Sequence, residues 1–113
     1  MKENLPFLKH ILDETDFLMD KTKGLAFEDY LKDEVLKRAT TRSIEIIGEA
    51  AKFLPADFKG SHPDVEWNAI IGMRNKIIHF YFGIKWATVW SVIKNEIPDL
   101  NVKIGEIIRE AEE

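Results

Sequence analysis

The sequence contains no cysteine and no apolar run of membrane-spanning length, and its net charge is -4. Without cysteine the chain forms neither disulfides nor cysteine-ligated zinc sites. The opening segment Met1–Phe7 lacks the apolar run of a signal peptide, so we expect a cytoplasmic protein with no membrane partner. The negative charge argues against a general electrostatic grip on nucleic acid, because lysine and arginine displace counterions from phosphates. Any contact with RNA therefore has to be local.

Several signatures of other fold and function classes are also missing. No segment alternates between apolar and polar residues over a useful length, which disfavours β-strands. The sequence has no internal repeat, no glycine-rich phosphate loop and no Ser/His/Asp signature. With 113 residues, 45% of them hydrophobic, it is long enough for one domain with a single core. We therefore predict one all-α domain over residues 1–113, an antiparallel bundle of four to five helices.

Apolar residues spaced by three and four define the expected helices. The pattern predicts helices at about 4–22, 33–54, 66–82, 85–97 and from about 99 onward, a single helical turn at 27–31, and a break at 55–65. Asp33 is a candidate N-cap for the second helix, and Pro55 ends that helix. Gly48 in mid-helix costs about 1 kcal/mol relative to alanine, so we expect another backbone to approach closely there.

A line of charged residues runs along the 33–54 helix at the same spacing and comprises Arg38, Arg42, Glu45, Glu49 and Lys52. In one interpretation it is a solvated row of intrahelical ion pairs worth a few tenths of a kcal/mol each. In the other, Glu45 or Glu49 neutralises and orients Arg74 on a neighbouring helix. The sequence leaves both interpretations open.

The segment Gly72–Gly83 places strong hydrogen-bonding groups within an apolar run, namely Arg74, Asn75, His79 and Tyr81. Arg74 lies at the centre of a stripe that is otherwise largely apolar, and its guanidinium cannot lose its charge. It must therefore reach water, a carboxylate or a phosphate. On one helix Arg74 and His79 point about 140° apart. A purely structural arrangement is the alternative, with Arg74 paired to an acid of another helix and His79 near the helix end.

The run Met73-Arg74-Asn75 through His79-Phe80-Tyr81 resembles the R-x-x-x-x-H-x-Y motif of the HEPN superfamily, specifically its HepT-like branch. Three further blocks agree in order with that branch. They are Ile46-Ile47-Gly48-Glu49-Ala50, His62-Pro63 followed by Trp67, and Lys9-His10-Ile11-Leu12. The resemblance covers nearly the whole chain.

The resemblance implies a HEPN-like symmetric homodimer, or a higher oligomer, that acts as the toxin of a prokaryotic HepT/MntA-type toxin-antitoxin pair. It implies a metal-independent endoribonuclease with Arg74 and His79 as the catalytic pair at the dimer cleft and Asn75 as a supporting hydrogen-bonding residue. Tyr81 becomes the hydroxyl that a partner nucleotidyltransferase antitoxin of the MNT type adenylylates to silence the toxin. RNA is the expected substrate. The protein itself needs no cofactor or metal, and ATP is used by the partner.

The side chains fit this chemistry. A histidine titrates near neutral pH and can move the proton of a 2′-hydroxyl, and an arginine can present a bidentate fork to phosphate. One departure is Lys85, where many relatives have an acid that could cap the next helix or contact the antitoxin. The alternative function is a non-catalytic dimeric subunit that binds a nucleotide or a nucleotidyltransferase. A helical bundle in which Arg74 is purely structural is a third possibility.

Overall fold

A computed structural model describes residues 2–79 and 83–113, and the backbone in these ranges forms helices and connecting turns. The elements in chain order are η1 (Lys2–Asn4), α1 (Leu5–Thr22), α2 (Phe27–Lys32), α3 (Glu34–Phe53), α4 (Ala56–Gly60), α5 (Trp67–His79), α6 (Trp86–Ser91), η3 (Val92–Glu96) and α7 (Ile97–Glu112). The predicted all-α fold class is confirmed. The symmetric homodimer stays a prediction.

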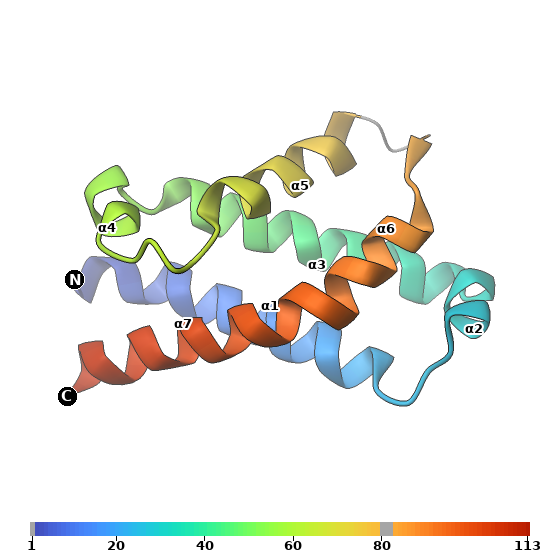
Figure 1. The fold of residues 1–113 in the computed structure, drawn as a ribbon, viewed down its shortest axis with the longest axis horizontal. Helices are drawn as coiled ribbons and strands as arrows, with labels where there is room; N and C mark the ends of the chain where they lie inside the picture. The colour runs from blue at the N-terminus through green and yellow to red at the C-terminus, as the bar shows by residue number, and fades with distance from the viewer. Residues whose placement is uncertain (1, 80–82) are drawn as a thin grey trace.

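Three long helices, α1, α3 and α7, enclose the core (Figure 1). Helix α1 packs against both α3 and α7, and α5 lies along the other side of α3. Fully or almost fully buried apolar side chains come from each of the three helices, among them Leu8, Ile11, Leu18, Ile47, Ala51 and Ile104. The spacing of these residues by three, four and seven is the pattern that predicted amphipathic helices.

Polar contacts join the same three helices. The Asn101 side-chain amide on α7 donates to Thr15 Oγ1 at 2.8 Å and to Asp16 Oδ1 at 2.8 Å on α1. The Ser43 hydroxyl on α3 donates to the Glu14 carbonyl oxygen at 3.2 Å. Thr15 and Ser43 are buried, so these bonds satisfy polar groups that water does not reach.

The helix boundaries follow local signals in the sequence. The Asp33 carboxylate accepts from the Leu36 N–H at 2.9 Å, which confirms Asp33 as the N-cap of α3. Leu54, immediately before Pro55, is extended with ψ of 137°, as the restriction on residues preceding proline requires. Gly24, just beyond α1, has φ of +72°, a conformation that glycine adopts without steric cost.

The predicted break at 55–65 is wrong for its first half, which forms the short helix α4. Pro55 stands in the extended N-cap position and its carbonyl oxygen accepts from Lys59 N–H at 3.0 Å. Phe58 is buried and fixes the turn to the core. A five-residue helix is shorter than two turns, so it shows no apolar period that could be recognised.

The expected break between the 85–97 helix and the helix from about 99 onward, at Pro98, is also corrected. Helices α6 and α7 are joined without interruption by η3, a π turn in which Ile97 N–H bonds to the Val92 carbonyl oxygen, five residues back. Pro98 has no N–H, and in a regular α-helix its ring would press on the carbonyl of residue 94. The wider π turn just before the proline lets the helix pass this point.

Within residues 2–79 and 83–113 no helix has both the length and the hydropathy needed to cross a bilayer.

Candidate functional site

Arg74 lies on α5 where that helix crosses Gly48 of α3. A Cβ added to Gly48 would overlap the Cβ of Arg74, and it would lie 2.8 Å from Arg74 Cγ and 3.3 Å from the Ile70 carbonyl oxygen. Only hydrogen fits in this space. The close approach of another backbone that Gly48 predicted is confirmed at the Ile70 carbonyl oxygen, but the nearest atoms belong to the aliphatic stem of Arg74.

The guanidinium of Arg74 is bonded to the side chain of its neighbour Asn75. Arg74 Nη1 donates to Asn75 Oδ1 at 2.9 Å. Arg74 Nε is buried and has no hydrogen-bond partner in residues 2–79 and 83–113 as far as the structure describes them, while the residue as a whole is half-buried. Among the residues that the structure describes, no carboxylate lies within ion-pair distance of this cation. Arg74 thus retains a positive charge that is not neutralised within the described chain.

Glu45 and Glu49 ion-pair with Arg42 and not with Arg74. Arg42 Nη1 lies 3.4 Å from Glu45 Oε2 and 3.6 Å from Glu49 Oε1. Arg42 precedes the two acids by about one and two turns on α3, so all three side chains share one face of that helix. Within one chain, Glu45 and Glu49 therefore do not neutralise Arg74, and that interpretation is wrong. The structure instead shows the two acids in ion pairs with Arg42 along α3, as the interpretation with intrahelical ion pairs predicted.

His79 is the last residue of α5, and Arg74 precedes it by five residues on the same helix. The backbone therefore keeps the expected angle of about 140° between the two positions. The side chain of His79 and the whole of Tyr81 lie outside the described residues. Their predicted roles, and the catalytic pairing with Arg74, stay predictions.

The His62-Pro63 and Trp67 block forms a structural contact at the start of α5. Trp67 Nε1 donates to the His62 carbonyl oxygen at 3.1 Å. The ring of Phe58 lies 4.8 Å from the ring of His62 and 6.3 Å from that of Trp67, measured between centroids. Trp67 and Phe58 are buried. This block therefore fixes where α5 begins, and with it the position of Arg74 two turns later.

Lys85, the departure noted in the sequence, occupies the N-cap position of α6 and makes no capping bond with its side chain. Its carbonyl oxygen accepts from Thr88 N–H at 3.0 Å and from Val89 N–H at 3.2 Å. A carboxylate here could accept from an N–H of the first turn, whereas an ammonium group cannot. The helix that carries α6, η3 and α7 therefore begins without a side-chain cap.

The described side chains offer a fixed cation and a hydrogen-bonding amide. A half-buried guanidinium that pairs with no described carboxylate suits a phosphate, which accepts charge-assisted hydrogen bonds. Within the described ranges no group of three or more His, Cys, Asp or Glu residues is placed to hold a metal ion.

Comparison with known proteins identifies the relatives of the chain. Residues 11–107 match the family described as "Ribonuclease HepT-like". The protein named "Putative RNase TTE0752" from Caldanaerobacter subterraneus subsp. tengcongensis is 50% identical over 109 residues, which span 96% of this chain and 97% of that protein. "Putative RNase MJ0127" from Methanocaldococcus jannaschii is 39% identical over 111 residues, covering 98% and 92% of the two chains.

A further relative is named "Probable ribonuclease HepT" and comes from Thermococcus cleftensis. It is 38% identical over 101 residues, which span 89% of this chain and 92% of that protein. No solved structure matches the chain at a significant level.

Proposed function

The chain belongs to the HepT-like ribonuclease family, and from this premise we propose that it is a metal-independent endoribonuclease, the toxin of a prokaryotic toxin-antitoxin pair in the cytoplasm. One observation carries the proposal. The guanidinium of Arg74 donates a hydrogen bond to the neutral amide of Asn75 and pairs with no carboxylate among the described residues. Its aliphatic stem is packed tightly on Gly48 of α3. Such a cation is positioned for an anion from outside, and an RNA phosphate supplies one.

The proposed reaction needs only a proton acceptor and a fixed positive charge. The imidazole of His79 takes the proton of a ribose 2′-hydroxyl, and the 2′-oxygen attacks the adjacent phosphorus. The bond from phosphorus to the 5′-oxygen breaks, and that oxygen takes up a proton from water as it leaves. Arg74 stabilises the charge that develops on the non-bridging oxygens. The products are a 2′,3′-cyclic phosphate and a 5′-hydroxyl end.

The test is cleavage of RNA by the purified protein alone, in the presence of EDTA. We expect 2′,3′-cyclic phosphate ends, and a loss of rate of about 10²-fold or more in His79→Ala and in Arg74→Ala. His10→Ala is the matched control, because His10 is an exposed histidine on α1. Cleavage that persists in His79→Ala, or that disappears with EDTA, would contradict the proposed chemistry.

A homodimer would bring the two catalytic positions together. Because Arg74 and His79 point about 140° apart on α5, a twofold axis can place one protomer's Arg74 beside the other's His79. A mixed dimer of Arg74→Ala and His79→Ala subunits then contains one intact composite site. We expect it to be more active than either single-mutant dimer. Equal inactivity of all three would argue against a composite site.

Tyr81 is the proposed site of control. Attachment of AMP by an MNT-type nucleotidyltransferase antitoxin, with ATP as donor, would place a bulky anion two residues from His79 and repel the substrate phosphate. Mass spectrometry after incubation with the partner and ATP tests this step. An unmodified Tyr81 peptide, under conditions in which the partner is active, would remove it.

A second candidate function is a non-catalytic dimer that binds a nucleotide or the nucleotidyltransferase. The net charge of -4 favours it, because an acidic protein attracts RNA weakly. In this case the purified protein does not cut RNA, and nucleotide binding survives His79→Ala but is lost in Arg74→Ala. The cleavage assay therefore separates the two functions.

A further inference from the structure

Helix α3 carries a row of residues that are spaced alternately by four and by three. The row comprises Val35, Ala39, Arg42, Ile46, Glu49 and Phe53. Because this spacing averages 3.5 residues, the six residues share one side of the helix over about 27 Å, and we call this side the outer face of α3. Val35 and Phe53, at its two ends, are 79% and 70% exposed, the highest values among the large apolar side chains that the structure describes. One chain by itself therefore leaves apolar surface in water at both ends of the row.

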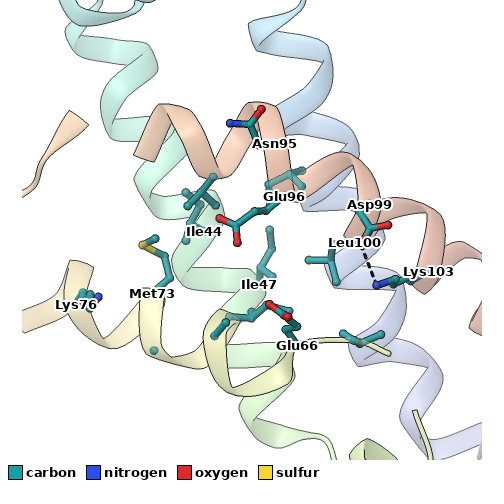
Figure 2. Close-up of a pocket in the computed structure, with 16 residues that line it drawn as sticks. Ile44, Ile47, Glu66, Met73, Lys76, Asn95, Glu96, Asp99, Leu100 and Lys103 are labelled. Atoms are coloured by element: carbon teal, nitrogen blue, oxygen red, sulfur yellow. Dashed lines mark ion pairs between the residues drawn. The ribbon is translucent and has the colours of Figure 1, made fainter. Parts of the chain in front are cut away.

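The other sides of α3 are occupied within the chain. Helix α1 packs along one side, and α5 crosses another at Gly48. Ile44 and Ile47 are buried and line the groove between α5 and η3, as Figure 2 shows. The outer face is the side that remains. At its C-terminal end the ring of Phe7 of α1 stacks on that of Phe53, with the centroids 5.9 Å apart and the planes at 17°.

The charges on this side of α3 are only loosely paired within one chain. Arg42 Nη1 serves both acids, Glu45 Oε2 at 3.4 Å and Glu49 Oε1 at 3.6 Å. A close charge-assisted hydrogen bond from nitrogen to oxygen is about 2.7–2.9 Å long. The side chains of Arg42 and Glu49 are 59% and 37% exposed. Both charged groups can therefore take a closer partner from outside the chain.

The order of the charges selects the direction of a partner helix. The N-terminal half of this side carries the cations Arg38 and Arg42. Two acids, Glu45 and Glu49, follow in the C-terminal half. A parallel copy of α3 would set like charges side by side, whereas an antiparallel copy sets the cations of each helix against the acids of the other. The surface is therefore complementary to itself in the antiparallel direction.

The apolar positions agree with the same direction. Reversal of the row about residue 44 places the row on itself, so Val35 comes opposite Phe53 of a second copy. In this register Arg42 stands one position of the row from the second copy's Glu49. Lys52 comes opposite the first turn of the other α3, which carries Glu34. Apolar contacts at both ends thus coincide with opposite charges between them.

We propose that a second copy of this chain docks antiparallel on the outer face of α3, with Val35 against the second copy's Phe53 and Arg42 ion-paired to the second copy's Glu49. The twofold axis makes each contact occur twice. The inference rests on the dimer of the proposed function and assigns its surface. Level with residue 44, the axis lies about 6 Å along α3 from Gly48, so the two Arg74 residues lie near the middle of the assembly's length.

Charge reversal tests the ion pair, with sedimentation velocity of the full chain as the measurement. The wild type should sediment as a dimer. Arg42→Glu and Glu49→Arg each set like charges together across the axis, so each variant alone should associate about tenfold more weakly or worse. An equal mixture of the two should recover association, because each of its mixed dimers has opposite charges at both positions. Arg42→Ala should weaken association only a few-fold, since it removes an attraction without adding a repulsion.

The controls for charge lie on α7. Arg109→Glu and Glu106→Arg change the net charge by the same amounts as the two reversals, at exposed positions away from α3. Both should associate as the wild type does. For the apolar ends, Val35→Ser should weaken association, whereas Val102→Ser, which removes an exposed valine of α7, should not.

Cross-linking reports the direction of pairing, because the sequence contains no cysteine. Chains with Val35→Cys and chains with Phe53→Cys are mixed and oxidised with diamide. We expect disulfides between unlike chains, since the antiparallel register sets the two positions opposite each other. Parallel pairing would instead join Val35→Cys chains to one another.

Several results would overturn the inference. A monomeric wild type would remove the second copy, and reversal variants that associate as the wild type does would assign the dimer to another face. Failure of the mixture to recover, or cross-links between like Val35→Cys chains, would exclude the antiparallel pairing. Circular dichroism shows whether each variant retains its helices. Association is measured without RNA, so a dimer that cuts no RNA contradicts the proposed reaction and leaves this inference intact.

Discussion

Gly48 of α3 and Arg74 of α5 lie so close that a single methyl group on the glycine would occupy the position of the arginine's Cβ. Gly48→Ala should raise the helix propensity of α3 by about 1 kcal/mol yet push α5 away. Overpacking of this kind costs about 1–3 kcal/mol. Because a small displacement of Arg74 weakens its hold on a phosphate, we expect the rate of RNA cleavage to fall about tenfold or more.

Gly105→Ala is the matched control for that substitution. A Cβ at Gly105 meets only Arg109 Nη1 at 3.6 Å and Leu12 Cδ1 at 3.9 Å, which are ordinary contacts. This variant should keep the wild-type rate and gain stability from the alanine. If Gly48→Ala folds and cleaves RNA as fast as Gly105→Ala does, then the close packing on Gly48 does not position Arg74.

Arg74→Ala should inactivate the protein without unfolding it. Removal of a cation that neutralises a buried acid costs about 3–5 kcal/mol, but no described carboxylate pairs with Arg74. We expect a loss of about 1 kcal/mol from the packing of the stem, measured as a shift of the urea midpoint. Arg74→Lys should keep the stability and still lose most of the activity, because lysine lacks the bidentate fork.

Arg42→Ala provides the comparison on α3. Arg42 is 59% exposed, so removing its ion pairs with Glu45 and Glu49 should change the stability by less than about 1 kcal/mol. The cleavage rate should change little. A collapse of the fold in Arg74→Ala, with Arg42→Ala unaffected, would instead favour the purely structural role for Arg74.

Lys85→Asp should stabilise the protein. An aspartate at the N-cap of α6 can accept a backbone N–H of the first turn and places a negative charge near the positive end of the helix. We expect a gain of about 0.5–1 kcal/mol and a rise of a few degrees in Tm. Lys85→Met removes the positive charge without supplying a cap, so it should stabilise the protein much less than Lys85→Asp does. Equal effects of the two changes would show that no cap forms.

Tyr30 should make the fold sensitive to alkaline pH. Its side chain is fully buried, and burial raises the pKa of its phenol above the ordinary value. Below about pH 10 the phenol is neutral in both the folded and the unfolded chain, so the full stability is present. As the pH rises further, the unfolded chain loses this proton first, and the free energy of unfolding falls until the folded pKa is passed.

Tyr30→Phe tests that dependence. The Tyr30 hydroxyl lies 2.8 Å from Thr40 Oγ1, which itself donates to the Lys37 carbonyl oxygen at 3.0 Å. Tyr30 is therefore the donor in the pair, and phenylalanine should cost about 1 kcal/mol at neutral pH. Urea midpoints between about pH 8 and pH 11 should decline less steeply in the variant. If the urea midpoint of the variant falls with pH as steeply as that of the wild type, other groups cause the loss of stability at alkaline pH.

Much of the fold was predictable because the long helices have strong local signals. Asp33 supplies a cap, Pro55 an end, and the apolar spacing of α1, α3 and α7 a clear period. The exceptions have physical reasons. Helix α4 is too short to show a period, and Pro98 looks like a break because the π turn that accommodates it has no sequence pattern of its own.

The candidate site was predictable in its residues but not in its partners. The sequence indicates that Gly48 has a close neighbour and that Arg74 must reach water, a carboxylate or a phosphate, but it cannot show that the two residues contact each other. Spacing alone leaves Glu45 and Glu49 equally able to reach along α3 or across to α5, and only coordinates show that Arg42 binds both.

The π turn between Val92 and Glu96 also limits where this chain can change length. A π turn holds one residue more than an α turn over the same stretch of axis, so deletion of one residue there would leave both flanks facing as they do now but would press the Pro98 ring on a carbonyl of the preceding turn. Deletion anywhere else in α7 would rotate the helix beyond it by 100° and turn its apolar side away from α1. A one-residue deletion at the bulge would therefore lose the fit of the proline, whereas one within α7 would lose the register of the apolar side.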